Sequence, residues 1–112
     1  MKNLTLNVKK KWFDMILSGV KKEEYREIKD FSVVRCLQMD SELGASFKEY
    51  DTVTFLNGMK TLTPTIVIEC KGIIIGGAVP EWSDNMQGEM FVIKLGELIS
   101  TKNINNNAST YI

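Results

Sequence analysis

The segment SGVKKEEYR, residues 18–26, joins a predicted helix to a predicted strand. The helix is expected because apolar side chains recur on one side of the preceding stretch and lysines occupy the other. Gly19 is expected to end this helix, since glycine adopts the left-handed conformation without strain. From residue 21 onward the chain alternates as a strand, which places Glu24 and Arg26 on the same side. The sequence therefore predicts that Lys21, Glu24 and Arg26 meet in one cleft.

A lysine, a glutamate and an arginine held together have a defined electrostatic character. Two cations around one carboxylate leave about one positive charge to receive a phosphate or a polarised carbonyl. Glu24 favours the protonated form of Lys21, so this lysine suits electrostatic stabilisation better than nucleophilic attack. Glu24 can also orient a water molecule or accept a proton from a ribose hydroxyl. The alternative is an ordinary ion pair that ties helix to strand and carries no function.

The spacing G-x-K-x-x-E-x-R, formed by Gly19, Lys21, Glu24 and Arg26, resembles the signature of the ASCH domain family, a branch of the PUA-like β-barrels. The flanking sequence matches as well, with Leu-x-Val and KKWFDMI before the motif, YDTVTF and an Asn-Gly pair midway, and FVIKL near the end. The resemblance covers residues 2–99. It implies a PUA-like barrel with the motif between its first helix and the next strand.

The remaining pattern predicts further strands around one main helix. This helix is expected at about residues 9–18 with Asn7 as its N-cap, and Gly72 is expected to bend the longest strand. The expected strands lie at about residues 2–8, 21–28, 52–57, 65–75 and 90–95, a short helix at 31–37, and loops at 38–49 and 76–88. These elements indicate an α+β fold, a small PUA-like mixed β-barrel of five to six strands with the main helix and a short second helix at its mouth.

The 112 residues have the composition of an ordinary globular protein and form one domain. We expect this domain to span residues 1–99 and a flexible, Asn-rich tail to span residues 100–112. The chain has no histidine, which excludes Ser-His-Asp triads, Cys-His dyads and histidine-ligated zinc sites. Cys36 and Cys70 form no CxxC pair, and neither a signal peptide nor a membrane-spanning stretch is recognisable. A cytoplasmic protein with reduced thiols and no membrane contact is therefore expected.

Charge is balanced over the whole chain but unevenly distributed along it. Residues 1–35 carry nine basic and five acidic side chains, a net charge of +4, whereas the remainder carries −4. Such asymmetry permits a basic face that meets phosphate. A lysine-rich helix can equally be a solvated helix without a ligand.

These features predict a protein that binds RNA, single-stranded or looped, or a nucleotide, in a cleft between the first helix and the barrel. Lys21, Lys22 and Arg26 are expected to hold phosphate. Trp82 is expected either to stack on a base or to pack as a lid on the end of the barrel. Asn57 is expected either to read the edge of a base or simply to form its turn.

Two other classes of function remain open. An enzyme acting on RNA or on a modified nucleoside would use Lys21 and Glu24 as catalytic residues. No cofactor or resident metal is expected, except that Mg²⁺ or Mn²⁺ would assist a nuclease. The resemblance extends to metal-assisted ribonucleases and to acetylcytidine amidohydrolases, although the latter have a threonine where this chain has Glu24. A protein-interaction module would bind a protein partner through the first helix or the C-terminal tail.

Overall fold

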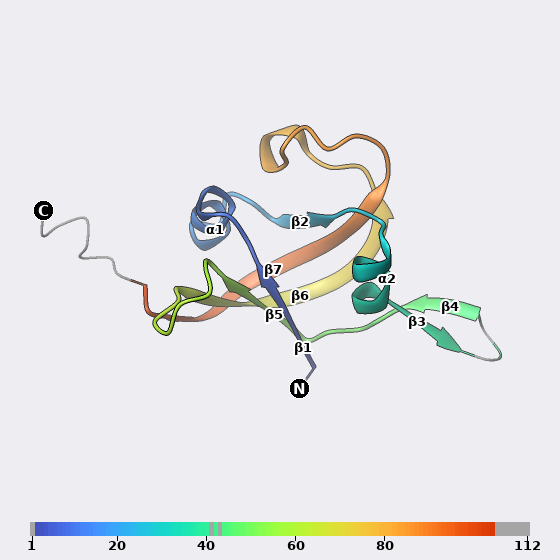
Figure 1. The fold of residues 1–112 in the computed structure, drawn as a ribbon, viewed down its shortest axis with the longest axis horizontal. Coiled ribbons are helices and arrows are strands. Elements are labelled where there is room, and N and C mark those ends of the chain that lie inside the picture. The colour runs from blue at the N-terminus through green and yellow to red at the C-terminus, as the bar shows by residue number, and fades with distance from the viewer. Residues whose placement is uncertain (1, 41, 43, 105–112) are drawn as a thin grey trace, which may run out of the picture.

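The computed structural model describes residues 2–40, 42 and 44–104, which fold as an α+β unit (Figure 1). No helix in this described part of the chain is long and apolar enough to cross a membrane. The helices are α1 (Lys10–Leu17), α2 (Asp30–Cys36) and the short 3-10 helix η1 (Pro80–Trp82). The strands are β1 (Asn3–Asn7), β2 (Glu23–Arg26), β3 (Leu37–Asp40), β4 (Gly44–Phe47), β5 (Thr52–Leu56), β6 (Thr65–Gly76) and β7 (Met90–Lys102).

Five strands form one mixed sheet in the order β1-β5-β6-β7-β2. β1 runs parallel to β5, and all other neighbours are antiparallel. The sheet curls into a half-barrel whose two edges are β1 and β2, with α1 connecting these edge strands and α2 following β2 (Figure 1). The predicted α+β class and a barrel-like mixed sheet are therefore confirmed.

The core forms between the curled sheet and α1. Trp12, Phe13 and Ile16, which belong to the predicted apolar stripe of α1, are all buried. Strand β1 alternates as predicted, with Leu4 and Leu6 buried between exposed neighbours. The sheet residues that are completely enclosed are Val53, Phe55, Ile66, Phe91 and Ile93.

The long β6–β7 ribbon carries the curvature of the sheet. Its register shifts between Val67 and Gly72, and Gly72 adopts a φ of 132° that side chains rarely tolerate. Irregularities of this kind bend a strand and increase its twist. The predicted bend at Gly72 is thus confirmed, and it supplies the bending that a half-barrel needs.

Two predicted loop or tail regions are strands instead. Residues 38–49 were expected to be a loop, but β3 and β4 pair as a hairpin from Leu37–Phe47 to Asp40–Gly44. The hairpin escaped prediction because none of its strand residues is fully buried and their burial does not alternate. β7 continues past its predicted end to Lys102, since its polar last residues pair with the start of β6. Residues 105–112, the rest of the predicted tail, lie outside the described residues.

The N-terminal end of α1 differs from the prediction, whereas its C-terminal end agrees with it. The N-cap is Lys9, without a side-chain hydrogen bond, because the amide of Asn7 is engaged with the carbonyl oxygen of Gly58 at 2.7 Å. At the other end Ser18 is the C-cap and Gly19 follows with a φ of 84°. Gly19 therefore ends the helix as predicted, in the left-handed conformation.

Replacing Gly19 by alanine tests this turn. Gly19→Ala should lower the free energy of unfolding by about 1–2 kcal/mol in a urea titration, because a Cβ is strained at this φ. The matched control is Gly77→Ala, where φ is ordinary and an added Cβ meets nothing within 4 Å. The control should leave stability unchanged or slightly raised. Equal losses in the two variants would contradict this account of the turn.

Candidate nucleic-acid interface

Lys21 is held between α1, β2 and the loop that carries η1. Its backbone N–H donates to the carbonyl oxygen of Met15 at 3.0 Å, which fixes the residue against the end of α1. Its side chain is only 1% exposed, and Nζ donates to the carbonyl oxygen of Trp82 at 2.6 Å. Nζ also lies 3.5 Å from Oε1 of Glu24. The lysine therefore lies inside the protein and does not emerge at an open mouth.

Two aromatic rings complete the surroundings of the buried ammonium. Nζ of Lys21 lies 5.0 Å from the ring centroid of Trp12 and 4.7 Å from that of Tyr25. Both distances fall within the range of cation–π attraction. Tyr25 itself donates its hydroxyl to Glu23 and accepts from the backbone N–H of Val79, and burial raises its pKa. The ammonium is thus enclosed by partners from three separate elements.

Burial decides the direction of the Lys21 pKa. Loss of hydration lowers this pKa from its ordinary value of 10.5, and the nearby carboxylate of Glu24 offsets only part of the effect. The sequence prediction considered Glu24 alone and expected the protonated form to be favoured. Glu24 does raise this pKa, as expected, but the opposing effect of enclosure by α1 and η1 was not visible in the motif.

Glu24 links the lysine to an arginine. Glu24 is 6% exposed. Its Oε1 faces Nζ of Lys21, and its Oε2 accepts hydrogen bonds from Arg26. The two bonds from Arg26 measure 3.0 Å from Nε and 2.7 Å from Nη2. Lys21, Glu24 and Arg26 therefore form one connected set, named here the charged triad. The sequence prediction that these three side chains meet is confirmed by these contacts.

Arg26 is the most accessible member of the charged triad. Its side chain is 27% exposed, whereas those of Lys21 and Glu24 are nearly enclosed. Nη2 also donates to the carbonyl oxygen of Asn7 at 3.0 Å. Asn7 ends β1, so this guanidinium bridges the two edge strands of the half-barrel. Its position is fixed by both edges of the sheet.

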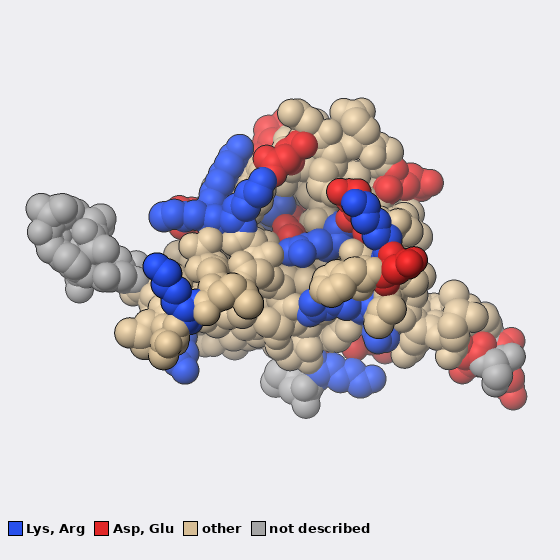
Figure 2. Space-filling model, viewed as in Figure 1, with Lys and Arg blue, Asp and Glu red and all other residues tan. Residues whose placement is uncertain are grey.

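Basic side chains gather around the charged triad. Figure 2 shows them spread over this face from α1 to the neighbourhood of α2, with basic and acidic atoms at the bottom of a recess beside α1. Nζ of Lys10 lies 2.7 Å from Oδ2 of Asp14, and Nζ of Lys11 lies 4.5 Å from the ring centroid of Trp12.

The loop after η1 is tied to α1 by a charged contact. Lys9 donates to Oδ2 of Asp84 at 3.1 Å, and the indole N–H of Trp12 reaches the same oxygen at 3.4 Å. The hydrogen bond from Lys9 lowers the pKa of Asp84. This contact closes one side of the recess.

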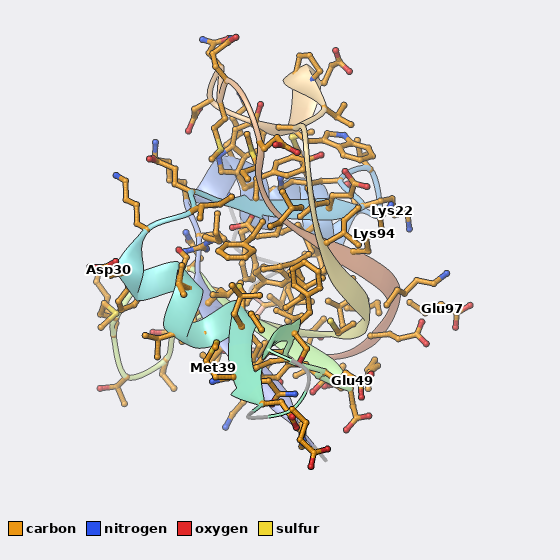
Figure 3. The ribbon with its side chains drawn as sticks, turned by 90° about the vertical axis from the view of Figure 1, so that its right-hand side faces the viewer. Lys22, Asp30, Met39, Glu49, Lys94 and Glu97 are labelled. Carbon is orange, nitrogen blue, oxygen red and sulfur yellow. The ribbon has the colours of Figure 1, made fainter. Side chains whose placement is uncertain are left out.

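Lys22 is not part of this face. It lies beside Lys94, on the side of the molecule away from Asp30 (Figure 3). It lines a separate surface hollow with Glu69 and Glu97. The reason is elementary, because consecutive residues of an extended chain point to opposite sides. A buried Lys21 therefore turns Lys22 away from the charged triad.

Trp82 and Asn57 are held by structural contacts. Trp82 is half-buried and packs against the buried cluster of Tyr25, Met90 and Val92, a contact compatible with the packed alternative of its two predicted roles. The side-chain amide of Asn57 donates to the carbonyl oxygen of Val8 at 2.9 Å.

Two residues that the sequence analysis did not select lie beside Arg26. Phe31 and Arg35 of α2 line one small hollow together with Arg26 and the apolar side chains of β1. The sequence signal was available, because residues four apart on a helix are neighbours. Phe31 was interpreted only as part of an apolar helix face.

Among residues 2–40, 42 and 44–104, no group of three or more Cys, Asp or Glu side chains is arranged to hold a metal ion. The chain matches none of the protein-family models, curated proteins or solved structures with which it was compared. Its chemistry is therefore inferred from the charged triad and the basic face around it.

Removing the carboxylate at the centre of the charged triad should be costly. Glu24→Gln leaves two cations facing each other without a counter-charge and should lower the free energy of unfolding by about 3 kcal/mol in urea titrations. The matched control is Glu27→Gln, because Glu27 pairs with Lys29 at 3.0 Å and both side chains are largely exposed. That variant should cost less than about 1 kcal/mol. Similar losses would mean that the charged triad is an ordinary surface pair.

Lys21 should make stability depend on pH. Because its pKa is lowered in the folded state, the unfolded chain binds more protons between that lowered pKa and 10.5. The free energy of unfolding contributed by Lys21 therefore rises with pH across this window. Urea titrations should show the stability difference between the wild type and Lys21→Met shifting in favour of the wild type from neutral pH towards about pH 10. Cys36 and Cys70, whose pKa values burial raises, titrate in both proteins and cancel. A constant difference would contradict the lowered pKa.

Proposed function

We propose that this protein is a PUA-like domain of the ASCH type that binds single-stranded or looped RNA, or a nucleotide, on the face that carries the charged triad. Three residues of the motif, Lys21, Glu24 and Arg26, are in contact, and Gly19 makes the turn that leads to them. The curled α+β sheet is compatible with such a fold. Both cysteines are free, which supports a reducing compartment such as the cytoplasm.

The observation that supports this proposal most directly is that Arg26 has a fixed position within a group of net positive charge. The charged triad has two cations and one carboxylate, so it retains a net positive charge. Arg26, whose side chain is 27% exposed, presents that charge to solvent. Its Nη1, which makes none of the hydrogen bonds to Glu24 and Asn7, remains to donate to a phosphate oxygen. Arg26 is therefore the residue proposed to contact the RNA backbone.

Lys21 and Glu24 serve this contact as positioning residues. Lys21 already has Trp82, Glu24 and two rings around its ammonium, so it holds the carboxylate and leaves phosphate to other residues. Glu24 in turn orients Nε and Nη2 of Arg26. The exposed lysines of α1 extend the phosphate contacts along the same face. This arrangement replaces the predicted phosphate contacts of Lys21 and Lys22.

Turnover of RNA or of a modified nucleoside requires Lys21 or Glu24 to reach a substrate. Both side chains are covered by protein, and the ammonium is fully engaged. Their enclosure supports binding rather than catalysis.

The proposal predicts salt-dependent binding of a fluorescein-labelled RNA of about 12 nucleotides, measured by fluorescence anisotropy. Arg26→Gln should weaken binding at low salt and reduce the slope of log K against log salt by about 1, because one phosphate contact is lost. The matched control is Lys94→Gln, which removes a paired cation on the other side of the sheet (Figure 3).

The control should leave both affinity and slope unchanged, and circular dichroism checks that each variant is folded. Absence of RNA binding by the wild type at about 50 mM salt would overturn the proposal. Equal effects of Arg26→Gln and Lys94→Gln would overturn the placement of the site.

A further inference from the structure

Phe31 is an exposed aromatic side chain next to the charged triad. It lies in the first turn of α2 and is 70% exposed. The opposite side of this helix is anchored, with Cys36 buried and Val33 packed against the core. The ring therefore points away from the core on a helix whose position is fixed.

The ring has an ordered cation on it. The guanidinium carbon of Arg35 lies 5.6 Å from the ring centroid of Phe31, and Nη2 of Arg35 donates to the carbonyl oxygen of Thr5 in β1. The guanidinium group of Arg35 is thus positioned by two contacts, one with the ring and one with the edge of the sheet. Ordering these side chains in advance reduces the entropy that a ligand must remove when it binds. With most of its area exposed, the ring keeps a face open to solvent.

The surroundings select a class of ligand. Phe31 and Arg35 line one small hollow with Arg26, and the guanidinium group of Arg35 lies on the exposed ring. An apolar segment of a protein partner would cover the ring but would also take charge away from water, which is unfavourable. A single nucleic-acid strand offers both complements at once, since a base stacks on the ring and a phosphate meets the guanidinium groups.

We infer that Phe31 is a base-stacking platform and that Arg35 holds the adjoining phosphate. This inference rests on the proposed RNA-binding function and specifies its substrate, a strand whose bases are unpaired where it crosses α2. Bases inside a duplex are already stacked and cannot lie on a side chain. The platform is therefore specific for single-stranded or looped segments.

Phe31→Ala should weaken binding of the same single-stranded RNA by about tenfold, because stacking on an aromatic side chain is lost. The salt slope should stay that of the wild type, since no charge is removed. Phe31→Trp should restore affinity, and its indole fluorescence should be quenched by the RNA beyond any change in the wild type. The matched control is Val34→Ala on the same helix, 67% exposed, which should bind as the wild type does.

The outcomes separate the platform from the proposed function. A wild type that does not bind the RNA overturns both. RNA binding that Phe31→Ala leaves unchanged overturns the platform alone. Equal losses in Phe31→Ala and Val34→Ala would assign this helix face to general apolar contact, as with a protein partner, and would also overturn the platform. A duplex of the same sequence should bind more weakly and be insensitive to Phe31→Ala.

Discussion

The structure depends on the compensation of one buried ammonium. Taking a charged group out of water costs several kcal/mol unless partners replace the lost hydration. For Lys21 these partners come from α1, β2 and the η1 loop: the ring of Trp12, the carboxylate of Glu24 and the carbonyl oxygen of Trp82. No one of these elements can shift without exposing the ion to an unfavourable environment. A single lysine therefore fixes the relative positions of a helix, an edge strand and a loop.

The same charges bridge the open side of the half-barrel. The two edge strands, β1 and β2, have no common backbone ladder, and the carbonyl oxygens of Thr5 and Asn7 accept from arginine side chains. Arg26 makes this bridge, and Glu24 fixes the guanidinium group by accepting a hydrogen bond from it. Fold and candidate site are consequently one structure, because the two arginines that donate to the edge of β1 also line the small hollow beside Phe31.

The local sequence predicted those features that local physics controls. The stripe of α1, the turn at Gly19, the bend at Gly72 and the meeting of the charged triad all follow from spacing and conformational preference. Features set by distant segments were not predictable in this way. The burial of Lys21 depends on a loop some 60 residues later in the chain, where the carbonyl oxygen of Trp82 accepts a hydrogen bond from Nζ. Strand pairing likewise converts a polar stretch after residue 95 into the end of β7.

The β3–β4 hairpin packs against the core less extensively than the main sheet does. It forms a two-stranded sheet of its own, and only its first pair, Leu37 and Phe47, packs against the core. Met39, farther along, is 80% exposed, and the hairpin projects from the right-hand side of the molecule (Figure 1). Two strands without a covered face are marginally stable in water. Amide hydrogens of this hairpin therefore exchange with solvent through local opening, whereas those in the middle of β6 and β7 exchange only when the whole domain unfolds.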